Sequence, residues 1–402
     1  MSRRRKDILL ALVVIPISLL LTFIAGLHLY MTRTATPLHP EPERVPSVTT
    51  RDPSPEWTEA VERGRLVMRA GLSEQNLPGL SVAVGIRGEI VWAEGFGWSD
   101  LDKRVAVAPD MRFRIGTASV ALTSAAAGLL LEKNRLKLDD EIQTYVPEFP
   151  YREWPVTLRH LMGDTSGVPN DGGDEGPLFT KRCERPADAF QFLSGYEREL
   201  LFEPGTKYHY SSYGWIAVSA AIEAAAGEPL QAFMRKQIFE ALEMADTVAD
   251  SETQTSPDQV ASYFPRYAAN PRYGPDVIRK IGFSCYSGSS VFVSTPADLV
   301  RFGMAIDSGK LLQPATVQLL HTSQPLASGE MTGHGLGWDL ETVTLGGEET
   351  EVIGHDGTVL GGTVASLIIL PAQGIVVAVL SNVSYADTFA LAVKIAEAFA
   401  HG

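Results

Sequence analysis

The chain has 402 residues and carries 34 Lys and Arg against 48 Asp and Glu, a formal net charge of −14. Its 45% hydrophobic and 20% charged residues are ordinary for globular proteins, which excludes a disordered, collagen-like or coiled-coil chain. The acidic balance argues against nucleic-acid binding, because that binding needs clustered Lys and Arg. Two cysteines, Cys183 and Cys285, are too few for a disulfide scaffold. They could pair in an oxidising compartment, but two buried thiols are the more cautious expectation.

The N-terminus predicts a membrane anchor. A short segment, residues 1–7, contains four consecutive basic residues, and the run from Ile8 to Met31 that follows has no Asp, Glu, Lys or Arg. About 20 apolar residues span a bilayer, whereas the apolar part of a signal peptide has about 7–15. We therefore predict a signal anchor over residues 8–31, with residues 1–7 in the cytoplasm and a single-pass chain whose domain lies on the extracytoplasmic (periplasmic) side. A long cleaved signal peptide is the alternative, and it also exports the domain.

Residues 32–56 contain six prolines. Proline-rich segments are semi-rigid and extended, so this stretch predicts a spacer between the anchor and a folded domain over residues 57–402. It has no basic cluster that would indicate recognition of anionic lipid headgroups.

The remaining chain predicts strands at both ends and helices between them. Residues 57–73 have a helical pattern, and residues 118–136 form a long run rich in Ala and Leu. Two strands, 80–86 and 89–95, flank Arg87-Gly88 as in a hairpin. Further strands are expected at 363–370 and 374–380, followed by a terminal helix over 385–400. This order is typical of an α+β domain with a helical insertion.

Ten short motifs follow one another in an order that resembles the serine β-lactamase and penicillin-binding-protein superfamily. Class C β-lactamases, DD-peptidases, esterases and the mitochondrial β-lactamase-like proteins are the most similar groups. The motifs are Leu77–Leu80, Phe113–Thr117, Leu136–Glu141, Tyr145–Phe149, Leu161–Gly167, Phe202–Thr206, Tyr208–Ser212, Ser294–Asp298, Gly335–Trp338 and His355–Gly357. The resemblance implies the β-lactamase/transpeptidase-like fold, an antiparallel sheet flanked by helices with a helical subdomain.

Three motifs carry the chemistry in that superfamily. In S-x-x-K the serine attacks a carbonyl and the lysine helps to remove its proton. Y-x-N supplies a base or proton shuttle and an amide that grips the substrate. K-[ST]-G or H-x-G places a cation on the substrate carboxylate and completes the oxyanion hole with a backbone N–H.

The first motif is degenerate in this chain. Thr117 stands at the nucleophile position and Val120 at the lysine position. Ser119 points away from the site, about 200° round the helix, and Lys133 lies roughly 24 Å along it, so neither replaces the missing pair. Val120 by itself is an ordinary core residue.

The other two motifs are better retained. Tyr210 is present with Ser212 in place of the asparagine, and His355-Asp-Gly357 is intact and followed by Thr358. A tyrosine with a pKa of about 10 is ionised roughly one part in a thousand at pH 7, so a histidine base is the better partner for a Thr117 nucleophile. The resemblance implies an oxyanion hole formed by the N–H groups of Thr117 and Thr358, with Ser212 and Gly357 beside the substrate.

Two hypotheses follow. The first is a hydrolase that acts on the amide or ester bonds of peptide, β-lactam or ester substrates with Thr117, Tyr210 and His355. The second is a pseudoenzyme that binds a cell-wall peptide or a protein partner, and a weaker third is a structural role at the membrane. No cofactor is expected, and no His, Cys or Asp cluster has the spacing of a metal site.

Two further residues and one stretch carry no chemical assignment. Asp164 is given no role, His334 is expected at the surface or on a pocket rim, and residues 169–176 are interpreted as a mobile acidic loop near the pocket.

Overall fold

The computed structural model describes residues 3–50, 52–150, 153–170, 178–193, 199–250, 258–278, 281–359 and 361–400. The helices are α1 (Arg3–Thr34), α2 (Thr58–Gln75), α3 (Ser119–Glu132), α4 (Leu158–Met162), α5 (Phe190–Leu193), α6 (Ser212–Ala226), α7 (Leu230–Met234), α8 (Pro296–Asp307), α9 (Pro314–Leu320) and α10 (Thr388–Ala400). The strands are β1 (Ser47–Thr49), β2 (Gly79–Ile86), β3 (Glu89–Asp100), β4 (Val105–Ala106), β5 (Phe113–Arg114), β6 (Val248–Ala249), β7 (Tyr263–Pro265), β8 (Pro275–Val277), β9 (Phe292–Ser294), β10 (Asp339–Leu345), β11 (Glu348–Val359), β12 (Thr363–Leu370) and β13 (Ile375–Ser381). Most of the acidic loop expected at residues 169–176 lies outside the described residues.

The main sheet joins the two ends of the domain. Its strands lie in the order β1-β3-β2-β13-β12-β11-β10 and every neighbouring pair is antiparallel. The predicted hairpin forms β2 and β3, and both of its turn residues, Arg87 and Gly88, have the positive φ that a tight two-residue hairpin requires. The predicted α+β fold, with N-terminal and C-terminal strands in one antiparallel sheet, is confirmed.

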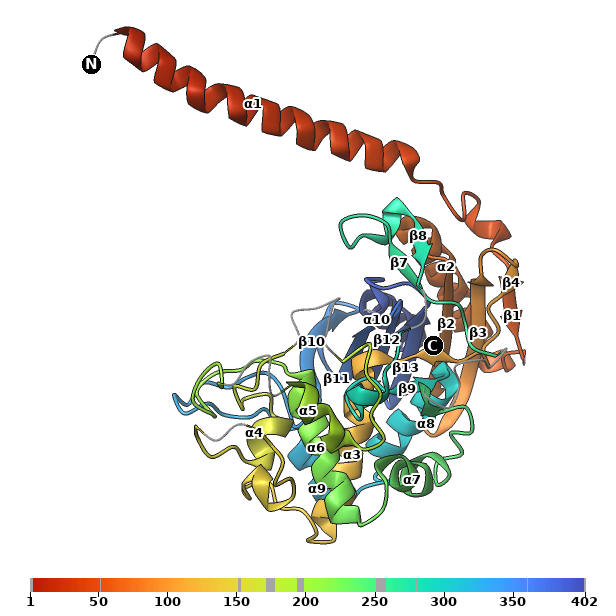
Figure 1. Cartoon of the computed structure of the whole chain (residues 1–402). Coiled ribbons are helices and arrows are strands. Elements are labelled where there is room, and N and C mark those ends of the chain that lie inside the picture. Colours follow the sequence, from red (N-terminus) through yellow and green to blue (C-terminus); the bar gives the residue numbers. More distant parts are fainter. Residues whose placement is uncertain are drawn as a thin grey trace.

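Helices cover both faces of this sheet (Figure 1). Helices α2 and α10 pack together over one face, and α8 packs on the other, where α3 and α6 form the helical region. Alternate residues of β2 therefore enter different cores: Val82 and Val84 pack with α2 and α10, while Ala83 packs with the helical region. This two-sided burial explains why β2, β12 and β13 are buried along their whole length.

The proline-rich segment is not a free spacer over its whole length. Strand β1 pairs with β3, and Val45 is buried. The side chain of Asn76 accepts a hydrogen bond from the N–H of Leu38 (2.7 Å) and donates one to the carbonyl of Thr36 (3.3 Å). Because these contacts attach residues 36–49 to the domain, most of the expected spacer belongs to the fold.

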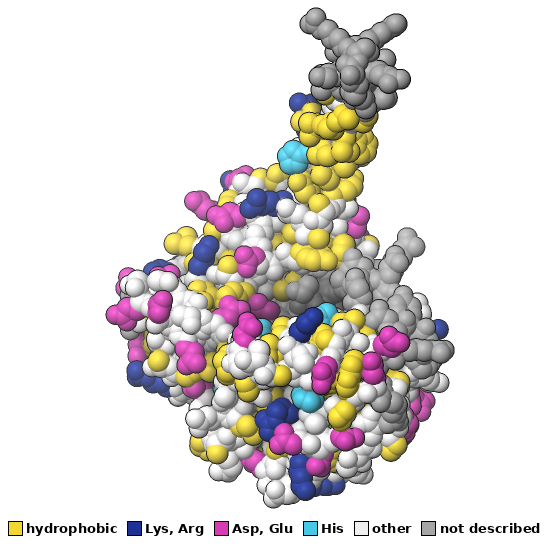
Figure 2. Space-filling model, turned by 90° about the vertical axis from the view of Figure 1, so that its left-hand side faces the viewer, with side chains coloured by type: hydrophobic (Ala, Val, Ile, Leu, Met, Phe, Trp, Pro, Cys, Tyr) yellow, Lys and Arg dark blue, Asp and Glu magenta, His cyan; other side chains and the backbone are white. Residues whose placement is uncertain are grey.

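Helix α1 projects away from the domain. Residues Val13–Thr34 form a helix with a mean hydropathy of 2.1, long and apolar enough to cross a membrane. Figure 2 shows apolar side chains around the described part of this projecting helix, whereas acidic and basic side chains are scattered over the domain. Nearly all of its described side chains are exposed, as expected of a segment whose apolar surface has little protein to pack against.

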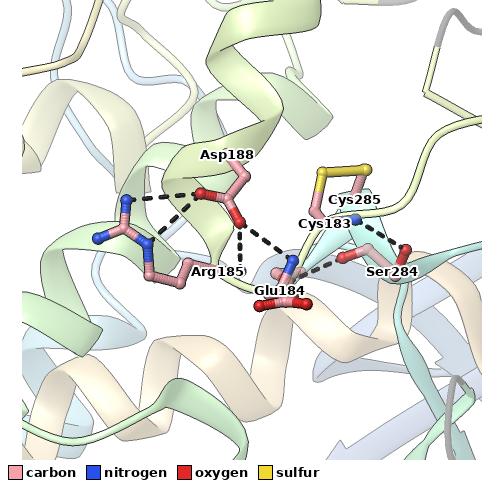
Figure 3. Close-up of a disulfide and its surroundings, with 7 residues drawn as sticks. Cys183, Glu184, Arg185, Asp188, Ser284 and Cys285 are labelled. Atoms are coloured by element: carbon pink, nitrogen blue, oxygen red, sulfur yellow. Dashed lines mark hydrogen bonds and ion pairs between the residues drawn. A yellow bond between two sulfur atoms is a disulfide. The ribbon is translucent and has the colours of Figure 1, made fainter.

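Cys183 and Cys285 form a disulfide (Figure 3), so the expectation of two free thiols is wrong. The N–H of Cys183 donates to the hydroxyl of Ser284 (3.2 Å), which fixes the two chain segments side by side. The carboxylate of Asp188 accepts the N–H groups of Glu184 (3.1 Å) and Arg185 (2.8 Å) and so orders the chain after Cys183. The sequence could not predict this pairing because 102 residues separate the two cysteines.

Candidate functional site

Thr117 lies at the base of the helical region, in a 3-10 turn (Gly116–Ala118) that runs directly into α3. Helix α3 is buried over most of its length because nearly all of its residues are apolar or small. The Thr117 side chain is half-buried, and its hydroxyl donates a hydrogen bond to the main-chain carbonyl of Asp356 (3.0 Å). A hydroxyl has one proton, so in this arrangement Thr117 does not donate to a basic side chain.

His355 approaches the same carbonyl from strand β11. Its Nδ1 lies 2.8 Å from the oxygen of Asp356, and the residue is buried, with 8% of its surface exposed. Because a carbonyl oxygen only accepts, Nδ1 carries the proton and a neutral ring has its lone pair on Nε2. The main-chain oxygen of Asp356 therefore accepts hydrogen bonds from both Thr117 and His355.

Gly357 allows β11 to come this close to the turn. A Cβ at this position would lie 2.0 Å from the carbonyl oxygen of Ile115 and 2.6 Å from the nitrogen of Ala118. No side chain fits between these backbones, so the glycine is required by contact rather than by a special dihedral angle. Thr358 follows in β11 paired with Val364, and its side chain lies outside the described residues.

Tyr210 comes from the loop before α6, and Asp164 holds this loop in place. The carboxylate of Asp164 accepts the N–H of Ser211 (3.2 Å) and the indole N–H of Trp215 (3.4 Å). Ser211 caps α6 by accepting the N–H of Gly214 (3.0 Å). Asp164, which sequence reasoning left without a role, is thus a positioning residue for the Tyr210 loop.

These segments enclose a cavity of about 200 Å³. Thr117, Tyr210 and His355, the three residues predicted to be catalytic, line it together. The remaining lining residues are Asp164, Tyr208, His334, Gly335, Gly337, Trp338, Asp339 and Asp356. Ser212 and Gly357 are buried behind this wall, so their predicted contact with substrate remains a prediction.

Val120 occupies the lysine position as a core residue. It is fully buried and packs in the apolar core of the helical region. Among the described residues that line the cavity there is no Lys or Arg. The cation that the family places beside its nucleophile therefore has no replacement in this part of the wall.

Three acidic residues, Asp164, Asp339 and Asp356, line the cavity instead, although the carboxyl group of Asp356 hydrogen-bonds Ser366, its neighbour in β12, on the side of the sheet that faces α10. Burial raises the pKa of Asp164 well above its usual range, against the opposing hydrogen bonds from Ser211 and Trp215. Burial also raises the pKa of Asp356 to about 6. Sequence reasoning passed over all three, although Asp339 directly follows the Gly335–Trp338 motif and Asp356 is the central residue of His-Asp-Gly.

The pKa of Asp339 shifts in the opposite direction from the pKa values of Asp164 and Asp356. Burial pushes its pKa upward, but the neighbouring His355 and His334 outweigh burial and leave that pKa below its usual value. The Nδ1 of His334 lies 3.0 Å from a carboxylate oxygen of Asp339. His334 also stacks on the ring of Tyr208, with centroids 4.2 Å apart, and so lies on the pocket rim as expected.

The sequence of this chain is similar to that of known proteins over most of its length. The sequence model of the β-lactamase family matches residues 65–400. The chain belongs to the β-lactamase family. Its relatives include the mitochondrial serine β-lactamase-like protein LACTB of Mus musculus, which is 24% identical over 85% of this chain and 81% of the relative. Penicillin-binding protein 4* of Bacillus subtilis is 25% identical over 67% of this chain and 60% of the relative.

Solved structures confirm the fold assignment for this family member. The octameric penicillin-binding protein homologue from Pyrococcus abyssi superposes with a TM-score of 0.70 at 22% identity, covering 84% of this chain and 77% of that one. The D-amino acid amidase from Ochrobactrum anthropi superposes with a TM-score of 0.70 at 21% identity, covering 85% and 99%. The predicted membership of the serine β-lactamase and penicillin-binding-protein superfamily is confirmed, and the chain is a β-lactamase-like member of a serine-hydrolase family.

Proposed function

We propose that this chain is a membrane-tethered, exported member of its family that binds a small ligand in the cavity and does not perform acyl transfer. The observation that carries the proposal is the hydrogen bond from the Thr117 hydroxyl to the carbonyl of Asp356. A nucleophile is activated when its proton is drawn toward a base, and a neutral carbonyl is not a base. The apolar Val120 adds no charge that could activate it.

The expected rate loss is large. If deprotonation depends on a tyrosine with an ordinary pKa near 10, only roughly one molecule in a thousand has the base form at pH 7, a deficit of about 4 kcal/mol. Family members offset this deficit with the lysine that this chain lacks. The backbone N–H groups near Thr117 and Thr358 persist whatever the side chains are, so the cavity keeps a polar end that can hold a ligand oxygen.

A slow hydrolase is the second candidate, and the shared carbonyl of Asp356 favours it. The Thr117 hydroxyl and the Nδ1 of His355 both contact this one oxygen, which places nucleophile and base side by side. A Thr–His pair for small esters or amides would form if the ring took the other tautomer, with its lone pair on Nδ1, and the Thr117 hydroxyl turned toward that nitrogen. The methyl group of Thr117 would crowd the attack.

Intact-mass measurement tests the two candidates. The full chain in detergent is incubated with a penicillin and with a fluorophosphonate, beside Thr117→Ala, Thr117→Ser and the double variant Thr117→Ser/Val120→Lys. The binding proposal expects no adduct on the unmodified chain and an adduct on the double variant, or on Thr117→Ser if the Val120→Lys substitution unfolds the helix. One adduct on the unmodified chain that is lost in Thr117→Ala would overturn the proposal and establish the hydrolase.

Two features support the membrane and export part of the proposal. Helix α1 is apolar enough to span a bilayer and follows basic residues at its start. The Cys183–Cys285 disulfide is typical of a compartment outside the reducing cytosol. The domain should stay with carbonate-washed membranes and be cleaved by protease added to the extracytoplasmic side; release by carbonate, or protection from that protease, would contradict the assignment.

A further inference from the structure

Helix α1 is attached to the domain at its last turn. The guanidinium group of Arg266, in the connection between β7 and β8, donates a hydrogen bond to the carbonyl of Thr34, the last residue of α1 (3.1 Å). The ring of Tyr267 contacts the ring of Tyr30 edge-on, with centroids 6.3 Å apart. The domain therefore begins where the helix ends, in place of the gap expected from a proline-rich spacer.

Asn76, at the end of α2, holds the chain that leaves α1 against the same connection. Its side chain contacts Thr36 and Leu38, as described above, and donates a further hydrogen bond to the carbonyl of Arg272 (3.4 Å). Asn76 is buried, so water competes little for these bonds. One side chain thus fixes three segments to one another: the chain after α1, the β7–β8 connection (residues 266–274) and α2.

When α1 spans a bilayer, it also sets the depth of the β7–β8 connection. The uncharged run of α1 ends just before Arg33, and Tyr30 lies about 4.5 Å from Arg33 along the helix axis. Tyrosines are enriched at this level of a membrane, where the ring meets apolar chains and the hydroxyl meets water. Tyr267 packs against Tyr30 and lies at the same level whatever the tilt of the helix. Figure 1 shows β7 and β8 beside the end of α1 that joins the domain.

The chain around this point has the charge that a lipid surface attracts. Residues 30–40 and 263–278 contain three arginines, Arg33, Arg266 and Arg272, and one acid, Asp276, in a protein with a formal net charge of −14. Arg33 and Arg272 are exposed. Arginines close to a membrane surface are attracted to anionic lipid headgroups, and guanidinium groups bind phosphate through charge-assisted hydrogen bonds. The local charge is therefore complementary to lipid phosphate, although the whole chain is acidic.

We propose that the β7–β8 connection rests on the bilayer beside α1 and binds the phosphate groups of membrane lipids through Arg272 and Arg33, with the rings of Tyr30 and Tyr267 in the interfacial layer. The inference rests on the membrane-spanning role proposed for α1 and adds a second contact with lipid. This contact holds the domain against the membrane in one orientation, whereas a free spacer would let the domain turn.

Fluorescence quenching tests the placement. Ala268→Cys puts a single thiol at the exposed tip of the β7–β8 connection, because the two native cysteines are joined in a disulfide. The full chain, labelled there with nitrobenzoxadiazole, is reconstituted in phospholipid vesicles that carry nitroxide headgroups in both leaflets. Ala232→Cys is the matched control, an exposed alanine in α7, which lies at the opposite end of the domain from α1 (Figure 1). We expect loss of fluorescence from the label at residue 268 and none at residue 232.

A lipid titration tests the phosphate contact at the same label. The chain labelled at residue 268, in maltoside detergent, is titrated with a phosphatidylglycerol and with a diacylglycerol that carry the same nitroxide acyl chain. We expect half-maximal quenching at an at least about fivefold lower concentration of phosphatidylglycerol, as one arginine beside a lipid phosphate predicts. Arg272→Gln should raise that concentration about fivefold, whereas Arg182→Gln, at an exposed arginine outside these segments, should leave it unchanged.

Equal quenching at residues 268 and 232, equal titrations with the two lipids, or an unchanged phosphatidylglycerol titration in Arg272→Gln would each overturn the inference. Thermal denaturation identifies any loss of fold, and Arg33→Gln then takes the place of Arg272→Gln. The carbonate wash decides the proposed membrane span separately. A chain released by carbonate would overturn the span, whereas a chain that stays in the membrane with an unquenched label at residue 268 would overturn this inference alone.

Discussion

The central strands and the cavity beside β10 and β11 differ in what they bury. Strands β2, β12 and β13 are buried from end to end, and apolar residues from both of their faces enter the two cores. The cavity, a few residues away in β11, buries carboxyl groups and histidines. Burying a carboxyl group costs free energy unless it is paired or hydrogen-bonded, whereas burying a valine gains about 1.5–3 kcal/mol.

The difference shows which region stabilises the other. The sheet and its helices supply stability, and the cavity holds groups that reduce it. Buried polar and titratable groups that lower the stability of the fold are typical of binding and catalytic sites. Substitutions in the supporting framework should therefore destabilise the fold, and neutralisation of a cavity acid should do the reverse.

The largest effect is expected from the disulfide, which ties the helical region together on the cavity side of the sheet. Replacing both cysteines, Cys183→Ala/Cys285→Ala, frees a loop of 102 residues and should lower the free energy of unfolding by about 4 kcal/mol. In thermal denaturation this is a fall in Tm of roughly 5–10 °C. Dithiothreitol should lower the Tm of the unmodified chain to that of the variant and leave the variant unchanged; a Tm that is insensitive to both would show that the bridge contributes nothing.

The second effect is expected where the framework and the cavity meet. Gly357→Ala places a methyl group against the backbones of Ile115 and Ala118, and the strand or the turn must move. Overpacking of this kind costs typically about 1–3 kcal/mol, and rigid backbone on both sides favours the upper end, about 3 kcal/mol. Gly214→Ala, in α6 close to the same site, is the control because its Cβ would meet only ordinary contacts at 3.5 Å or more. Equal denaturation midpoints for the two variants would contradict the close approach.

The same contrast explains what the sequence could and could not predict. Strands β12 and β13 and the β2–β3 hairpin are local patterns, so apolar runs and the Arg87-Gly88 turn placed them correctly. The cavity wall is a product of folding: Asp164 and Asp339 lie far apart in the chain, and no local pattern shows that they face one space. The disulfide and the attachment of residues 36–49 were missed for the same reason.

A third prediction inverts the usual sign of a core substitution. Because Asp356 has a pKa of about 6 in the folded chain and about 3.9 when unfolded, the folded state holds its proton more tightly. Stability from this group is therefore complete below about pH 4 and is lost as pH rises through about 6. Asp356→Asn should raise the free energy of unfolding by up to about 3 kcal/mol at pH 7.5 and by little at pH 4.

Urea denaturation at the two pH values measures this difference, with Asp102→Asn as an exposed control that should change neither. A variant that is less stable than the unmodified chain at pH 7.5 would show that Asp356 stabilises the fold, and the contrast between framework and cavity would not hold at this residue.

The smallest effect is expected at Asp164, which belongs to both regions: it lines the cavity and also holds the loop before α6. Asp164→Ala leaves the N–H of Ser211 and the indole N–H of Trp215 without their acceptor and places alanine at a φ of +53°, so about 2 kcal/mol should be lost. Asp164→Asn keeps an acceptor oxygen and tolerates the left-handed conformation, so it should cost less than half as much. If alanine and asparagine cost the same in urea denaturation, the hydrogen bonds from Asp164 do not position the Tyr210 loop, and its burial serves the ligand rather than the fold.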